Sequence, residues 1–176
     1  MLQLNSVANV GVHRTCTPLY EKYEATPYNT FLDPSETGNI YSGFVLTRSG
    51  PDTVALLGSS SVTSLTTAQQ PFGLSALDRN ANIDDVTQVG VNAWAVWLGG
   101  SNAFFSLTAP AFDTTASYAV PTTGARQWLY VNTNQPGQLT TVSGVAPYNI
   151  PVAELIDVLS PTQITIRLID NVNPQN

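Results

Sequence analysis

The sequence predicts an all-β protein: one compact β-barrel or β-sandwich domain with an extended N-terminal arm. Short runs rich in Val, Ile, Leu and aromatic residues alternate with clusters of Gly, Pro, Asn and Ser, a pattern typical of short strands joined by turns. The 176 residues suffice for one domain with a sizeable core and are marginal for two. The chain has no repeat of fixed period and no low-complexity tract, which excludes solenoids, collagen and coiled coils.

The first 39 residues differ from the rest, because they show little periodicity and their prolines separate several aromatic residues. Proline fixes φ and removes a ladder donor, so we expect an extended arm at 1–39, the β-domain at 40–170 and a tail at 171–176. Four aromatic residues of the arm are candidate anchors for a partner protein, with packing on the chain's own domain as the alternative: Tyr20, Tyr23, Tyr28 and Phe31.

Strand-type runs fill the region after residue 39. We expect strands near 40–47, 53–57, 62–66, 93–98, 103–108, 117–120 and 127–132. Gly and Pro clusters separate them, and the Gly-Gly-Ser-Asn break at 99–102 lies between two strongly apolar runs. That break predicts a hairpin between the strands on either side.

The run at 93–98 carries tryptophan on both of its faces. Side chains alternate along a strand, so Trp94 and Val96 share one side and Trp97 lies on the other. Neither side is suited to water, and we expect this strand to be buried within the domain.

The segment 151–159 is ambiguous on periodicity alone. Its apolar residues have helical spacing behind a proline, but some of them could instead share one face of a strand. The next residues, 160–163, have turn chemistry, and the alternation of Ile164, Ile166 and Leu168 with polar residues is a clear strand pattern. We therefore predict a closing β-hairpin.

Charged residues make up only 10% of the chain, against the roughly 25% typical of soluble domains. Such a chain is expected to cover much of its surface with protein partners. The net charge of −6, with six Lys and Arg in total and no basic cluster, argues against direct nucleic-acid binding. The longest apolar runs fall short of a membrane span, and residues 1–12 lack the features of a secretory signal.

Residues that could support catalysis are few. His13 is the only histidine, and Cys16, the only cysteine, lies three residues away in the expected arm without a rigid third group. Phosphate loops, dinucleotide fingerprints, zinc motifs and nucleophile elbows are missing from the sequence. We therefore predict no catalytic residue, no cofactor and no enzymatic activity.

Asp78, Asn80 and Asn82 have the spacing of the start of a calcium loop. The match then fails, because Ile83 occupies the position of the turn glycine and Val89 that of the bidentate glutamate. A solvated loop of Asx turns is the preferred interpretation, and no metal site is predicted.

The tryptophans offer a different function. Trp94, Trp97 and Trp128 could stack on sugars, as in a carbohydrate-binding adhesin. They lie within strand patterns, however, which favours core packing.

The order of several stretches resembles capsid decoration (cement) proteins of tailed bacteriophages. The stretches Pro-Phe-Gly-Leu-Ser-Ala-Leu-Asp at 71–78, Ile-Asp-Asp-Val at 83–86 and Ala-Trp-Ala-Val-Trp-Leu-Gly-Gly at 93–100 carry this resemblance. The stretches at 128–131, 137–140, 152–156 and 164–169 are similar to the closing pattern of small β-barrel head proteins. The resemblance covers roughly residues 70–170 and concerns texture and order rather than a mechanistic motif.

This resemblance implies a structural protein of the virion. It would dock on the outer surface of an icosahedral capsid, commonly as a homotrimer, and bridge subunits of the major capsid protein after synthesis in the cytoplasm of the infected bacterium. The arm at 1–39 would be the clasp, and neither membrane nor nucleic acid would be a partner. A receptor- or carbohydrate-binding module and a head-completion or tail protein are the alternatives.

Overall fold

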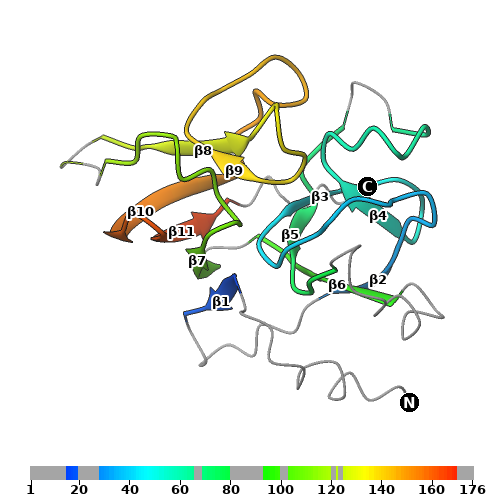
Figure 1. Cartoon of the computed structure of the whole chain (residues 1–176). Helices are drawn as coiled ribbons and strands as arrows, with labels where there is room; N and C mark the ends of the chain where they lie inside the picture. The colour runs from blue at the N-terminus through cyan, green and yellow to red at the C-terminus, as the bar shows by residue number, and fades with distance from the viewer. Residues whose placement is uncertain are drawn as a thin grey trace.

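All regular elements of the described residues are β-strands, which confirms the all-β prediction (Figure 1). They fall into a five-stranded closed barrel and a six-stranded sheet. The expected tail at 171–176 and much of the expected arm lie outside the described residues. The computed structural model describes residues 15–19, 28–65, 69–79, 93–99, 103–119, 122 and 125–169.

The barrel is closed because β2 pairs with a different strand on each of its two edges. β2 pairs in parallel with β4 and antiparallel with β6, while β3 pairs antiparallel with β4 and β5 and thereby completes the circle. Closure leaves no free edge among these strands, which removes a template for aggregation. In barrel order the strands are β2 (Tyr28–Leu32), β4 (Thr53–Leu56), β3 (Val45–Arg48), β5 (Gly73–Ser75) and β6 (Ala93–Trp97).

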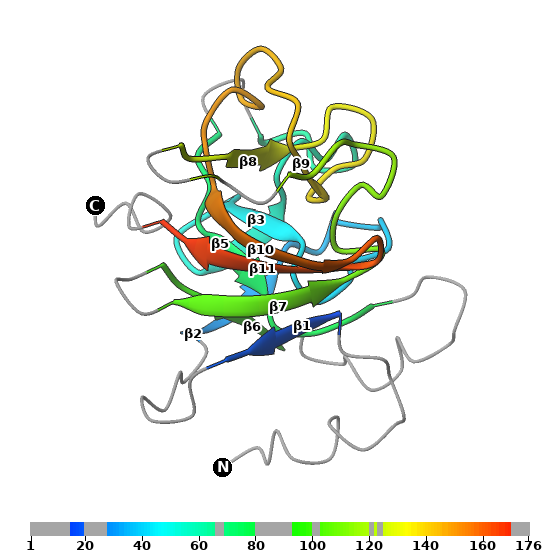
Figure 2. The same ribbon diagram turned by 90° about the vertical axis from the view of Figure 1, so that its left-hand side faces the viewer.

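The second sheet has the hairpin of β10 and β11 at its centre, and Figure 2 looks onto this sheet, whose strands are stacked above one another in front of the barrel. β7 pairs with β11 on one side of this hairpin, and β8 pairs with β10 on the other. In sheet order the strands are β1 (Cys16–Pro18), β7 (Phe104–Thr108), β11 (Gln163–Leu168), β10 (Ala153–Ser160), β8 (Trp128–Val131) and β9 (Leu139–Thr140).

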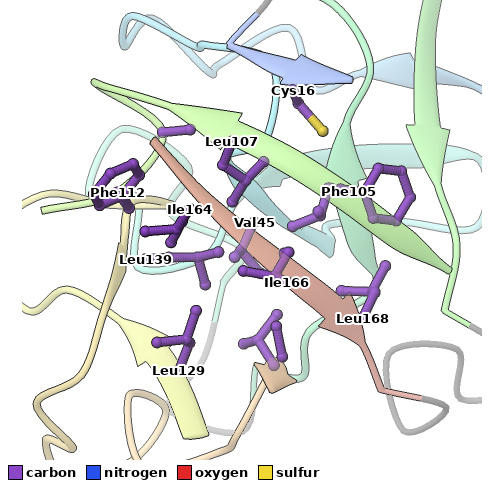
Figure 3. Close-up of a cluster of buried hydrophobic side chains, with 14 of the residues drawn as sticks. Cys16, Val45, Phe105, Leu107, Phe112, Leu129, Leu139, Ile164, Ile166 and Leu168 are labelled. Carbon is purple, nitrogen blue, oxygen red and sulfur yellow. The ribbon is translucent and has the colours of Figure 1, made fainter. Parts of the chain in front are cut away.

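Two hydrophobic cores follow from the alternation of side chains along these strands. The first fills the barrel and consists of Leu32, Ile40, Phe44, Leu46, Val54, Leu56, Phe72, Trp94 and Val96. Val45, Leu57 and Leu74 point out of the barrel and join the core of the six-stranded sheet. Figure 3 shows Val45 among Leu107, Ile164 and Ile166 of that sheet. The barrel and the sheet therefore share a core.

β6 lies between the two cores, as its two tryptophan faces predict. Trp94 is 3% exposed and lies in the barrel core, where its indole N–H donates to Ser75 Oγ at 3.0 Å. Trp97 packs against the second core, with its ring centroid 6.0 Å from that of Phe105. The prediction that this strand is buried within the domain is confirmed.

The predicted hairpin across 99–102 is wrong. β6 pairs with β2 and β5 in the barrel, whereas β7 pairs with β1 and β11 in the sheet. Turn residues predict only the local path of the chain and not which strands pair. Both faces of β6 must be buried, and this requires the barrel core on one face and the core of the six-stranded sheet on the other. The chain therefore crosses from one sheet to the other at this break.

Two further expected strands are not found in the described part of their ranges. Residues 62–65 form a turn in which the Leu65 N–H donates to the Val62 carbonyl at 3.2 Å, and the side chain of Val62 is buried. Residues 117–119 are held by the Gln127 side chain, whose amide contacts the Ser117 carbonyl and the Ala119 N–H. The strand expected at 40–47 begins only at Val45.

The predicted closing hairpin is confirmed. β10 and β11 pair antiparallel around a turn at 161–162, and β10 contains two register shifts, between Leu155 and Asp157 and between Val158 and Ser160. These bulges place Ile156 and Leu159 outside the regular alternation. Their exposed fractions are 37% and 54%.

Two stretches of the 1–39 segment are strands of the fold: β1 pairs with β7, and β2 pairs with β4 and β6. The start of β1 is fastened by Ser42, whose hydroxyl accepts from the N–H groups of Thr15 at 3.0 Å and Cys16 at 3.2 Å. The boundary expected at residue 39 therefore comes after two strands that belong to the two sheets.

Candidate partner-binding surfaces

The candidate anchors that can be placed, Tyr28 and Phe31, lie on β2 and are 39% and 45% exposed. They are three residues apart on a strand, so they point to opposite faces. Tyr28 shares the inward face of Thr30 and Leu32, and its ring meets that of Phe72 edge-on at 5.6 Å. Phe31 points outward, and the two therefore do not form one patch.

Tyr20 and Tyr23, the other two candidate anchors, lie outside the described residues. They are flanked by Leu19, which is 46% exposed and whose N–H donates to the Phe104 carbonyl at 3.0 Å. Exposed apolar residues thus stand at both ends of the stretch 19–31, which we call the N-terminal aromatic segment. Single exposed apolar side chains are common on protein surfaces, so these residues mark the segment as a candidate for partner contact without defining a continuous patch.

A second group of large side chains lies across the outer face of the six-stranded sheet. In register order, Phe104 of β7, Arg167 of β11, Glu154 of β10 and Trp128 of β8 face one another. Glu154 forms an ion pair with Arg167, while Arg126 reaches Glu154 Oε1 at 3.6 Å and lies 5.8 Å from the Trp128 ring centroid. This row could not be predicted from the sequence, because its register is set by tertiary pairing between the strands.

Cys16 is not an available nucleophile. Its side chain is buried in the core of the six-stranded sheet, and burial, with a smaller contribution from Asp78, holds the pKa of the thiol far above its ordinary value. The thiolate, which is the reactive form, is therefore disfavoured. His13 lies outside the described residues.

The calcium-like stretch is described only at its start. The Asp78 carboxylate accepts a hydrogen bond from the Ser42 N–H, which gives it a structural role, while Asn80 and Asn82 lie outside the described residues. Within the part of the chain that the structure describes, no three His, Cys, Asp or Glu side chains are grouped so that they could hold a metal ion.

The tryptophans proposed as sugar-stacking residues have different surroundings. Trp94 is buried in the barrel core, and Trp97 is partly buried and packs against the core of the six-stranded sheet. Trp128 is partly buried on the outer face of the sheet, beside Arg126. Of the three, Trp128 is the one that lies on the outer face of the sheet beside a guanidinium.

Comparison with known proteins gives a match to a family model. None of the described residues belongs to a helix with the length and hydropathy of a membrane span. No curated protein and no solved structure shows a significant similarity to the chain. A family model described as phage cement protein, however, matches residues 2–174. This match extends over nearly the whole sequence of 176 residues, and the chain therefore belongs to the phage cement protein family.

Proposed function

We propose that this protein binds the outer surface of an icosahedral phage capsid and cements neighbouring subunits of the major capsid protein. The family match over residues 2–174 is the observation that carries the proposal. The function is mechanical: the protein stabilises the assembled state by binding it and slows the separation of its subunits.

The way the N-terminal aromatic segment is attached supports its role as a clasp. β1, at one end of the segment, is hydrogen-bonded to β7 of the sheet, and β2, at the other end, is hydrogen-bonded to β4 and β6 of the barrel. A pull on residues 19–27 is therefore transmitted to both sheets. We assign the partner contacts of this segment to Tyr20, Tyr23, Tyr28 and Phe31, because buried aromatic anchors dominate binding energy at interfaces.

Assembly as a homotrimer would strengthen such a clasp. Three linked copies convert the second and third docking events into intramolecular ones, which raises the overall affinity without any new contact. Mass measurement of the free protein tests this part of the proposal separately from shell binding.

The test is co-sedimentation with purified shells that lack the protein. Truncation at residue 39 would remove β1 and β2, so the N-terminal aromatic segment is better tested by the variants Y20S/Y23S and F31S. We expect each to weaken shell binding by about tenfold or more at unchanged Tm, since losing an anchor costs about 2 kcal/mol or more and about 1.4 kcal/mol corresponds to a tenfold change in affinity. Leu159→Ser, at a similarly exposed aliphatic residue of β10, is the control.

Two results would overturn these assignments. Failure of the wild-type protein to sediment with shells would reject the cement function itself. If the wild type binds shells and the aromatic variants bind equally well, only the role of the N-terminal aromatic segment as a clasp is rejected. Copy number on the virion separates the cement role from a head-completion or tail protein, which is present in few copies.

Carbohydrate binding is a second candidate, favoured by the partly exposed Trp128 beside Arg126. An aromatic face next to a guanidinium could hold a sugar ring and its hydroxyl groups. A saccharide-dependent change in tryptophan fluorescence that is lost in Trp128→Phe would support it, and a featureless titration across a glycan panel would reject it.

A further inference from the structure

The two most exposed large hydrophobic residues of the described chain lie together in one loop. Val145 is 79% exposed and Val142 is 64% exposed, both in the connection from β9 to β10. Figures 1 and 2 show this loop, coloured yellow to orange, projecting beyond β8 and β9 at the top of the molecule. We refer to residues 141–151 as the valine loop.

The ends of the valine loop are held close together by β8. Thr140, just before it, pairs with Tyr130, and the N–H of Val152, just after it, donates to the Leu129 carbonyl at 2.8 Å. A loop with adjacent ends that packs on its own side chains is an Ω-loop, a type that is frequently functional.

Tyr148 gives the loop its internal order. Its N–H donates to the Val145 carbonyl at 2.7 Å, and its carbonyl accepts from the Gly144 N–H at 3.2 Å. Its ring packs against the shared core and lies so close over Gly58 that a Cβ there would be 2.4 Å from the hydroxyl oxygen. Val142 and Val145 are therefore presented by a pre-ordered scaffold, which lowers the entropy lost on binding.

The loop is also free of charge, since no Asp, Glu, Lys or Arg occurs from residue 127 to residue 153. Covering its tip removes apolar surface from water without stripping the hydration shell of an ion. An apolar pocket is the complementary surface for such a tip.

We infer that the tip of the valine loop is a second docking surface, which inserts into an apolar pocket of a capsid subunit. This inference rests on the proposed cement function. Bridging two subunits requires two separated surfaces, and the valine loop lies at the opposite end of the molecule from β1 and β2, which hold the N-terminal aromatic segment (Figures 1 and 2). One copy can therefore contact two neighbouring subunits.

The size of the tip favours a capsid pocket over a second copy of this chain. The exposed residues of the loop are Val142, Ser143, Val145, Ala146 and Asn149. A stable dimer interface uses about 20–30 residues on each side, so tip-to-tip contact would be far too small. A small knob contributes when another surface of the same protein is already docked, because its effective concentration is then high.

The test is shell binding by V142S/V145S, with I156S/L159S as the matched control. Both variants replace two exposed branched aliphatic residues by serine, but the control residues lie on the bulges of β10. Co-sedimentation with shells should be weakened about tenfold or more for V142S/V145S and less than about twofold for the control. Both should keep the wild-type Tm and the wild-type mass in solution.

Each other outcome has a definite meaning. Equal binding by the wild type and V142S/V145S would overturn the inference and leave the cement function standing. A lower mass of V142S/V145S in solution would show that the tip contacts a second copy, which would also overturn it. Failure of the wild type to bind shells would reject the cement function and the inference together.

Discussion

Replacing Glu36 by alanine should destabilise the barrel more than any exposed acidic substitution. Glu36 is 3% exposed in the connection that follows β2, and its carboxylate accepts hydrogen bonds from three groups. Oε2 accepts from the Leu56 N–H at 3.1 Å, and Oε1 accepts from the Gly38 N–H at 2.9 Å and the Ser61 hydroxyl at 3.0 Å. The side chain thereby ties this connection to the end of β4.

The magnitude follows from where these donors lie. The Leu56 N–H is buried, and leaving it unsatisfied costs about 1–3 kcal/mol, while the partly buried Gly38 and Ser61 donors can reach water and cost about 0.5–1 kcal/mol each. The total is about 2–5 kcal/mol, which for a chain of this size lowers Tm by about 4–20 °C. Burial lowers the pKa of the Arg79 guanidinium, and the charge of Glu36 opposes that shift. The loss of this favourable interaction with Arg79 adds to the destabilisation caused by Glu36→Ala.

Thermal and urea unfolding of three variants test this reasoning. Glu36→Gln keeps the size of the side chain but turns one acceptor into a donor. Its free energy of unfolding should therefore lie between those of the wild type and Glu36→Ala. Asp33→Ala is the control, since among the described residues the Asp33 carboxylate accepts only from the nearby Ser35 N–H in an exposed turn, and its loss should cost about 0.5–1 kcal/mol. Equal stabilities of Glu36→Ala and Asp33→Ala would refute the assignment of Glu36 as a buried clamp.

Two further predictions concern the shared core. Cys16 should resist thiol reagents in the native protein, and because its folded pKa is raised above the ordinary 9.0, its contribution to stability is complete below pH 9 and is lost as pH rises further. Between pH 7.5 and pH 10 the free energy of unfolding should therefore decline less steeply in Cys16→Ala than in the wild type. Rapid labelling of Cys16 in the native protein would contradict its burial. Gly58→Ala should cost about 2 kcal/mol, because φ is +85° and the added Cβ meets Tyr148. Its cost should be less than additive with that of Tyr148→Ala in a double-mutant cycle, and full additivity would contradict the contact.

The β10 segment shows what periodicity can and cannot predict. Its apolar residues have helical spacing, yet it forms a strand, because a bulge at Ile156 turns Asp157 outward and brings Val158 onto the core. Strict alternation after Leu155 would have pointed Asp157 inward, where an unpaired carboxylate is costly. The turn and the clear alternation of β11 identified the hairpin, but a bulge leaves no local sequence signal that separates it from a helical turn.

Pairing between distant strands was the least predictable part. The parallel pairing of β2 with β4, which helps to close the barrel, joins a segment of the expected arm to the β-domain. Pro27 and Pro34 flank β2 and favour the interpretation of this segment as an extended arm. The alternation of Thr30 and Leu32 with Asn29 and Phe31 is therefore not recognised as a strand pattern. Had that alternation been recognised, it would have placed Tyr28 and Phe31 on opposite faces from sequence alone.

The exposed apolar side chains and the sheet edges point to the same mode of association. The edges of the six-stranded sheet are β1, three residues ending in Pro18, and β9, two residues. Edges this short offer few backbone groups to an incoming strand, and a proline removes one of them. A protein with blunt edges and a charge-free projecting loop is suited to binding through side chains in partner pockets. If the proposed cement function holds, many copies would cover a capsid without their sheets joining one another.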